Sequence, residues 1–230
     1  MDPAEHRAIS RRIARRFRRH WHRAYADRKL RYDPAYRAAA SLVIDSGESL
    51  LDIGCGLGLL GFYLRERGFR GAYRGVDFDA HKIAEAQHVA RSDAGLAFDG
   101  GSATSLPTFS GHVALLDVLH YLSAASQQEL LRDAAARVAP GAVLIIRNVL
   151  RERNWRFHAT VIEEHVLYAT RWMRSPALHY PARDEILTPL REAGLVVEVS
   201  PLWGFTPFNS FVIVARRPPA TTVMPELTPP

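Results

Sequence analysis

The stretch that decides the fold runs from Leu50 to Gly61 and reads LLDIGCGLGLLG. Its apolar start predicts a short buried strand over residues 50–53, and the residues after the first glycines predict a helix over 57–67. Glycine at such a strand-to-helix turn lets backbone N–H groups and the N-terminus of the helix approach a ligand closely. The stretch therefore predicts a ligand-binding loop at the carboxyl end of a strand.

The spacing of the glycines fits two kinds of cofactor. Gly54, Gly56 and Gly58 have the G-x-G-x-G spacing of an S-adenosylmethionine loop, whereas Gly56, Gly58 and Gly61 have the G-x-G-x-x-G spacing of a dinucleotide loop. Asp77 does not separate them, because a carboxylate at the end of the second strand would accept hydrogen bonds from ribose hydroxyls in either case. The glycines and Asp77 alone leave both cofactors open.

Asp52, two positions before the first glycine, is more selective. Its carboxylate would repel the pyrophosphate of a dinucleotide, and it would attract the ammonium group of a methionine moiety. The dinucleotide fingerprint also normally opens its domain, whereas here a predicted helical segment precedes the loop. Asp52 therefore favours S-adenosylmethionine, and a nicotinamide-dependent oxidoreductase is the alternative from a different class.

Short apolar runs alternate with amphipathic segments along the rest of the chain. The predicted strands are residues 50–53, 73–76, 96–98, 113–116, 143–146, 196–199 and 211–215, and the predicted helices are 57–67, 80–91, 126–138 and 183–193. Alternation of this kind is typical of a parallel sheet with helices on both faces. The sequence therefore predicts one α/β domain over 46–216, with an aromatic insertion over 151–180 and a proline-rich tail over 217–230.

The residues before this domain, 1–45, predict a basic helical arm. An apolar side chain recurs at every fourth position, with arginines between, as an amphipathic helix requires: Ile9, Ile13, Phe17, Trp21 and Tyr25. Pro34 predicts the start of a further helix that ends near Asp45. Residues 1–31 carry 11 Arg and Lys against three acidic residues, a net charge of +8, so the other residues carry 19 against 21, a net charge of −2.

The arm needs a surface for its apolar stripe and a partner for its charge. The stripe would pack on the main domain with a solvated arginine face, or it would meet a membrane surface or an acidic partner. Because the main domain is slightly acidic, a duplex-binding groove within it is not indicated, and we expect no DNA or RNA partner.

Cysteine usage and hydropathy exclude several other classes. The single cysteine, Cys55, cannot form an internal disulfide, and no cluster of Cys and His has the spacing of a metal site. No apolar run reaches the roughly 18 residues of a membrane span, and the first residues have no signal-peptide core. We therefore expect a cytoplasmic protein without a metal centre.

Five segments, in order, resemble the motifs of class I S-adenosylmethionine-dependent methyltransferases: LLDIGCGLG (50–58), RGVDFD (74–79), SATSLP (102–107), VALLDVLHYL (113–122) and RVAPGAVLII (137–146). The resemblance implies that family's fold, a doubly wound, Rossmann-like sheet of seven mostly parallel strands with an antiparallel last strand. It also implies S-adenosylmethionine as methyl donor and S-adenosylhomocysteine as product.

The resemblance further implies a cofactor site made of these residues: Asp52, Gly54, Cys55, Gly56, Gly58, Asp77, Phe78, Gly101, Ser102, Ala103 and Asp117. In it Asp77 would bind the ribose, and Phe78 would lie against the adenine. Ser102 stands where the family has an acidic residue that binds the adenine amino group, so either Ser102 or Asp99 upstream would accept that hydrogen bond. Cys55 would touch the cofactor, although a small core residue would look the same in sequence.

The methyl group of the donor is already electrophilic, so the enzyme mainly has to align it with the nucleophile. A weakly acidic nucleophile also has to lose a proton, and this step calls for a proton acceptor. His120, three positions after Asp117, is the candidate general base, with Tyr121 beside it. A structural, hydrogen-bonded histidine is the alternative for His120. Further candidate bases lie in the insertion: His158, His165 and His179.

Absent motifs point to a small acceptor. The chain has no N/D-P-P-Y/F motif, and its only cysteine lies in the cofactor loop, so methylation of DNA bases is not indicated. The insertion offers aromatic side chains that suit a flat, apolar acceptor: Trp155, Phe157, Tyr168, Trp172 and Tyr180.

The arm and the LGLLGFYL helix are similar to small bacterial methyltransferases of aryl-polyene and related pigment biosynthesis. That resemblance implies an aromatic acceptor, free or attached to an acyl carrier protein, whose acidity would suit the arm. The same arm would suit an anionic membrane surface, with the protein peripheral to the inner membrane. A protein of this fold that binds the cofactor without catalysis is a further alternative.

Overall fold

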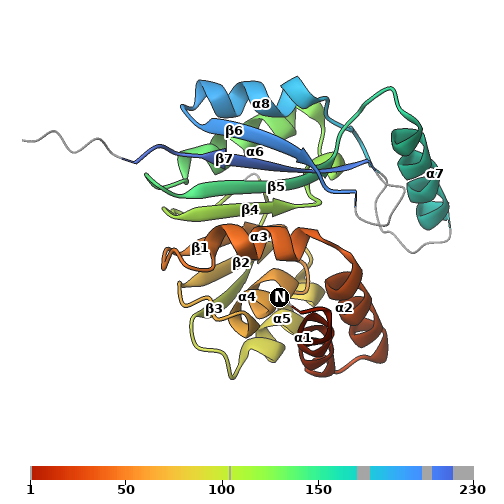
Figure 1. The fold of residues 1–230 in the computed structure, drawn as a ribbon, viewed down its shortest axis with the longest axis vertical. Coiled ribbons are helices and arrows are strands. Elements are labelled where there is room, and N and C mark those ends of the chain that lie inside the picture. Colours follow the sequence, from red (N-terminus) through yellow and green to blue (C-terminus); the bar gives the residue numbers. More distant parts are fainter. Residues whose placement is uncertain (1, 104, 170–176, 204–208, 220–230) are drawn as a thin grey trace, which may run out of the picture.

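The computed structural model has a seven-stranded sheet with helices on both faces (Figure 1). It describes residues 2–103, 105–169, 177–203 and 209–219, and only the backbone of residues 163–169. The strands are β1 (Leu50–Ile53), β2 (Tyr73–Asp77), β3 (Leu96–Gly100), β4 (His112–Leu116), β5 (Val143–Val149), β6 (Val196–Pro201) and β7 (Ser210–Arg216). Their order is β3-β2-β1-β4-β5-β7-β6, and β7 runs antiparallel to both of its neighbours. The predicted fold class is confirmed.

The helices predicted over 57–67, 80–91, 126–138 and 183–193 are present, and further helices lie in the N-terminal arm and in the insertion. They are α1 (Pro3–Arg15), α2 (His20–Tyr32), α3 (Ala35–Val43), α4 (Leu59–Glu66), α5 (Ala80–Ala90), the 3-10 turn η1 (Leu119–Tyr121), α6 (Ala124–Ala136), α7 (Trp155–Ala169) and α8 (Arg183–Glu192). The predicted insertion contains α7, which stands beyond the end of β5, apart from the sheet layers (Figure 1). The predicted tail from residue 220 onward lies outside the described residues.

The sheet is buried on both faces because side chains alternate along each strand. On β5, Val143 and Ile145 belong to the core beneath the N-terminal helices, α4 and α5, whereas Leu144 and Ile146 belong to the core beneath α6 and α8. This two-sided burial explains why the strands read as nearly continuous apolar runs. It also leaves the carboxyl ends of the parallel strands as the place for a site.

The N-terminal arm forms two helices, not one continuous stripe. Ile9, Ile13 and Phe17 are buried in the core that α4 shares, but the chain turns between Arg15 and His20, and α2 then buries a different face. The expectation of one helix whose whole apolar stripe packs on the main domain is therefore wrong for Trp21 and Tyr25, which are 51% and 41% exposed. Among the described residues, no helix is long and apolar enough to cross a membrane.

Packing of the arm on the domain gives a direct test in Phe17, which is fully buried 6.1 Å from the ring of Phe62. Phe17→Ala should lower the free energy of unfolding by about 3–5 kcal/mol, because it removes a buried aromatic ring and leaves a cavity. Trp21→Ala is the matched control, expected to cost less than about 1 kcal/mol because half of the ring is already in water. Urea denaturation measures both, and equal losses would contradict this packing.

Candidate active site

The glycine loop after β1 is shaped by backbone that only glycine adopts easily. Gly54, Gly56 and Gly58 have φ angles of 76°, 54° and 74°. A Cβ on Gly54 would lie 2.4 Å from Val118, and one on Gly58 would lie 2.4 Å from Phe98, so these two glycines permit close packing. A Cβ on Gly56 would have no neighbour closer than 4.0 Å, so bare backbone faces open space there. The loop fits a ligand laid across Gly56.

Asp77, at the end of β2, holds this loop in place. Its Oδ2 accepts a hydrogen bond from the N–H of Gly56 (2.8 Å), and its Oδ1 accepts one from the N–H of Asp79 (2.8 Å). The N–H of Gly101, after β3, donates to the backbone carbonyl of Asp77 (3.0 Å). The structure therefore brings three predicted cofactor residues from three consecutive strand ends together.

The predicted adenine residues lie beside this junction. Phe78 is 80% exposed, so its ring is open to a ligand. Ser102 and Ala103 follow Gly101, with Ser102 on the surface. Asp99, the alternative partner of the adenine amino group, forms an ion pair with Arg74 (2.7 Å). The Asp99 carboxylate therefore already has a partner on the neighbouring strand β2.

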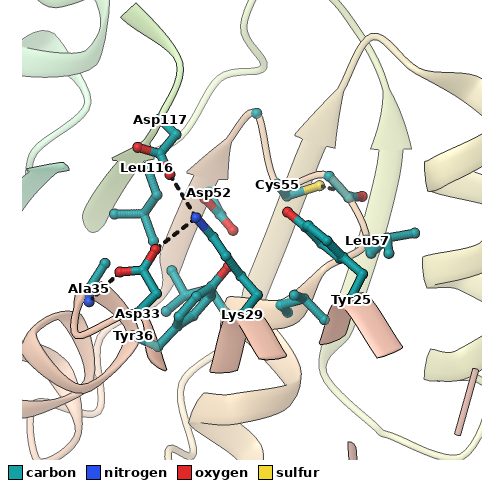
Figure 2. Close-up of a pocket in the computed structure, with 14 residues that line it drawn as sticks. Tyr25, Lys29, Asp33, Ala35, Tyr36, Asp52, Cys55, Leu57, Leu116 and Asp117 are labelled. Atoms are coloured by element: carbon teal, nitrogen blue, oxygen red, sulfur yellow. Dashed lines mark hydrogen bonds and ion pairs between the residues drawn. The ribbon is translucent and has the colours of Figure 1, made fainter. Parts of the chain in front are cut away.

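Asp52 lies on β1, almost fully buried, and lines the pocket drawn in Figure 2. Its carboxylate accepts a hydrogen bond from the hydroxyl of Tyr73 (2.5 Å). Burial raises the pKa of Asp52 to about 7. The hydrogen bond from Tyr73 lowers this pKa, and the nearby charge of Asp77 raises it further. A buried carboxylate of this kind is stabilised by a cation, as the ammonium group of a methionine moiety would provide.

The other wall of the pocket comes from the N-terminal helices (Figure 2). The residues that line the pocket, from both walls together, are Tyr25, Lys29, Asp33, Ala35, Tyr36, Asp52, Gly54, Cys55, Gly56, Leu57, Leu59, Leu60, Leu116 and Asp117. Tyr25 projects toward the loop beside Cys55 (Figure 2). Cys55 also packs against β2 at Gly75, so both interpretations of this cysteine agree with its position.

Asp117, at the end of β4, joins the two walls. It is the one described non-glycine residue with a positive φ, 63°. One carboxylate oxygen accepts a hydrogen bond from Lys29 Nζ on α2 (3.1 Å), and the other accepts one from Arg147 on β5. Lys29 also pairs with Asp33 (2.7 Å), as the dashed lines in Figure 2 show. The pocket is thus closed by an alternating array of two cations and two carboxylates.

The pKa shifts within this array show that its charges stabilise one another. Burial is the largest single effect on Lys29 and would lower its pKa, but Asp33, with smaller contributions from Tyr36 and Tyr25, raises the pKa above its ordinary value. Burial alone would raise the pKa of Asp33, but Lys29 and Arg147 lower it to about 2. Both groups are therefore charged across the neutral pH range.

His120 and Tyr121 occupy η1, just past Asp117, and are not among the residues that line this pocket. The ring of His120 is almost fully buried, with Nδ1 3.1 Å from Oδ1 of Asn148, and lies nearly parallel to the ring of Tyr180 at 6.3 Å. His179 pairs with Glu185 (3.0 Å) on the outer side of α8, and His158 is exposed on α7. The side chains of His165, Tyr168 and Trp172 lie outside the described residues.

Comparison with known proteins agrees with this architecture. A family model described as a methyltransferase domain matches residues 17–199. The chain belongs to the methyltransferase domain family. It is a class I methyltransferase that uses S-adenosylmethionine as its methyl donor. The dinucleotide alternative receives no support from this match.

Three solved structures show how widely this methyltransferase fold is shared. Magnesium protoporphyrin IX methyltransferase from Synechocystis PCC 6803, with bound S-adenosylhomocysteine, has a TM-score of 0.66 at 16% identity, over 91% of this chain and 93% of that one. An O-methyltransferase family protein from Burkholderia thailandensis has a TM-score of 0.62 at 19% identity, over 91% and 62%. The [4+2]-cyclase SpnF has a TM-score of 0.63 at 18% identity, over 81% of each. No curated protein sequence matches the methyltransferase.

Sequence reasoning missed the contribution of the N-terminal helices to the methyltransferase pocket. Tyr25, Lys29, Asp33 and Tyr36 line it, yet they stand outside the five class I motifs, and Arg147 follows the last of these directly. Two signals were available: these residues belong to the W-x3-Y-x3-K-L-R-Y-D-P-x-Y pattern of the arm (21–36), on which its resemblance to pigment-biosynthesis methyltransferases rests, and Lys29 is one of only two lysines in the chain. Nothing in the sequence pairs it with Asp117, 88 positions away.

The raised pKa of Asp52 predicts how cofactor affinity depends on pH. Below about pH 7 the carboxyl group is protonated and neutral, whereas an ammonium group favours the ionised form. The affinity for S-adenosylhomocysteine should therefore rise as the pH increases from 5.5, by up to about tenfold per unit, and level off above 7.

Calorimetry with two controls tests this dependence. Adenosine, which lacks the amino-acid moiety, should bind equally at each pH, and the Asp52→Asn variant should show a flat profile for S-adenosylhomocysteine. Affinity for S-adenosylhomocysteine that falls with rising pH, or a slope that survives in Asp52→Asn, would remove Asp52 from the ammonium site.

Proposed function

We propose that this methyltransferase transfers a methyl group to oxygen or carbon of a small aromatic acceptor in bacterial pigment or related secondary metabolism. The observation that carries the proposal is a group of aromatic rings directly after β4 and around α7. The rings of His120 and Tyr121 lie 4.1 Å apart, and Phe157 meets Tyr180 edge-on at 5.3 Å. Such rings, next to the Asp117 end of the pocket, suit a flat acceptor.

The cofactor would lie across the glycine loop, where S-adenosylmethionine supplies an electrophilic methyl group. Asp52 and Asp117 would bind its ammonium group, and Lys29 would face its carboxylate. Asp77 would bind the ribose and Phe78 would cover the adenine. We favour Ser102 as the partner of the adenine amino group, because its spacing to Pro107 matches the family motif, with Gly101 and Ala103 flanking it.

His120 is our candidate for the general base. The amide of Asn148 donates through Nδ2 to the carbonyl of Val149 (2.8 Å), which directs its Oδ1 toward Nδ1 of His120 (3.1 Å). This assignment places the proton of a neutral imidazole on Nδ1 and the lone pair on Nε2. His120 would then accept a proton from an acidic hydroxyl through Nε2, with Tyr121 beside it.

The acceptor would reach a cytoplasmic enzyme in one of two ways. An acyl carrier protein is acidic, so an acceptor attached to it would be drawn to the basic N-terminal helices. An apolar acceptor held in an anionic membrane would bring the protein to the periphery of the inner membrane. Both follow from the +8 charge of residues 1–31.

Single-turnover transfer from radiolabelled S-adenosylmethionine tests the proposed acceptor class. The probes are phenolic acids, free and as pantetheine thioesters, with S-adenosylhomocysteine affinity measured on the same protein. We expect a labelled methyl ether or ring-methylated product from at least one phenolic probe. Tight binding of S-adenosylhomocysteine with no label on any of them would contradict an aromatic acceptor.

The role of His120 has a matched control in His112, a buried histidine at the other end of β4 that is hydrogen-bonded to Ser46 (2.7 Å). His120→Gln should keep cofactor affinity and lose about 10² to 10⁴ in turnover on the best probe, because a positioned base is removed. Turnover should recover partly at high pH, where the acceptor ionises unaided. His112→Gln should leave turnover near normal, and equal effects in both variants would return His120 to a structural role.

A further inference from the structure

The apolar face of α1 is already in use, which determines what the N-terminal hairpin (α1 and α2, residues 3–32) offers to a partner. Ile9, Ile13 and Phe17 are buried in the core, so they cannot insert into a bilayer or a groove on another protein. Two of the intervening arginines are tied to the domain, Arg12 to Glu66 (2.8 Å) and Arg16 to Asp93. The hairpin is therefore held in one position, with its remaining surface outward.

The outward surface of the hairpin carries a large uncompensated positive charge. Of its 11 basic residues, Arg12, Arg16, Lys29 and Arg31 form ion pairs with carboxylates. In the described part of the chain, the side chains of the other seven form no ion pair with a carboxylate, and all seven residues are exposed: Arg7, Arg11, Arg15, Arg18, Arg19, Arg23 and Arg28. Arg7, Arg11 and Arg15 recur at every fourth position and so form a row along α1.

A second row, of aromatic side chains, follows one face of α2. Trp21, Tyr25 and Tyr32 are 51%, 41% and 64% exposed. At 100° per residue they lie within about 40° of one another around the helix, and they extend over about 16 Å along it. A second side of α2, centred about 120° away around the helix, is buried through His22, Ala26 and Leu30. An exposed straight row of large rings is uncommon on a surface that meets only water.

We propose that the N-terminal hairpin docks this protein on an anionic lipid bilayer. Trp and Tyr are the side chains that prefer the membrane–water interface, since a ring sits among the headgroups while its N–H or O–H stays hydrated. Exposed arginines add attraction to anionic lipids. Trp21 and Tyr32, near the two ends of α2, can meet a flat surface together, which favours a bilayer over an acidic protein, whereas Tyr25 between them turns its ring toward the pocket.

The position of Tyr25 links docking to the pocket. Tyr25 belongs to the aromatic row and also lines the pocket beside the glycine loop (Figure 2). A hairpin seated on lipid therefore places the pocket entrance at the bilayer surface, where an amphiphilic acceptor would be concentrated. The docking itself does not depend on the proposed function, but this route for the acceptor does.

Vesicle sedimentation of the full chain tests docking. We expect binding to vesicles of equal phosphatidylglycerol and phosphatidylcholine, little binding to phosphatidylcholine alone, and a loss of binding between 0.1 and 0.5 M NaCl. The triple variant Arg7→Gln, Arg11→Gln, Arg15→Gln should bind on the order of 10²-fold more weakly, at about fivefold per arginine. The corresponding triple lysine variant should keep its binding, because the charge is retained.

A charge-matched control separates the hairpin from net charge. The variant Arg132→Gln, Arg191→Gln, Arg216→Gln removes the same charge from exposed positions on α6, α8 and β7, and it should change binding by less than about threefold. Trp21→Ala with Tyr32→Ala should also weaken binding, whereas Trp155→Ala, at an exposed ring on α7, should not.

Three results would overturn the proposal: no binding to anionic vesicles, equal losses in the hairpin and control variants, or binding to an acidic acyl carrier protein without binding to vesicles. Calorimetry with S-adenosylhomocysteine on the same variants should show unchanged cofactor affinity, since none of the substituted residues lines the pocket. A failure of the proposed acceptor class would appear in the transfer assay with vesicle binding intact, so the two failures are distinguishable.

Discussion

The carboxylate of Asp117 is held by two cations that come from different layers of the fold, Lys29 of α2 and Arg147 of β5. Each of these groups is partly withdrawn from water, and each would be costly to leave without its partner. The array therefore forms only if the N-terminal hairpin and the sheet are assembled together. It makes the hairpin one wall of the pocket.

The charges around the pocket are complementary to an amino acid. Asp52 and Asp117 present negative charge beside the bare backbone at Gly56, and Lys29 presents positive charge from the facing helix. An α-amino acid carries the reverse pair, an ammonium and a carboxylate. A pocket of this kind explains why Asp52, whose pKa burial raises to about 7, gains from a bound cation.

The sheet and the loop could be predicted from sequence because their signals are local. Short apolar runs locate the strands, and the glycines locate the turn after β1. The break between α1 and α2 has no such signal, since residues 16–19 read RFRR without glycine or proline, and the apolar spacing continues through Trp21. The array could not be predicted for a different reason. Lys29 and Asp117 meet only because α2 folds back over the end of β4, and no local pattern records that contact.

A double-mutant cycle on Lys29 and Asp117 tests most directly whether the hairpin is part of the cofactor site. Lys29→Met, Asp117→Asn and the double variant would be compared by calorimetry for S-adenosylhomocysteine affinity, with Arg12→Met and Glu66→Gln as a control ion pair between the hairpin and α4. The two pocket substitutions should each weaken binding and should be coupled by about 0.5–3 kcal/mol, while the control pair leaves affinity unchanged. Unaltered affinity in Lys29→Met, or strictly additive losses, would contradict the account.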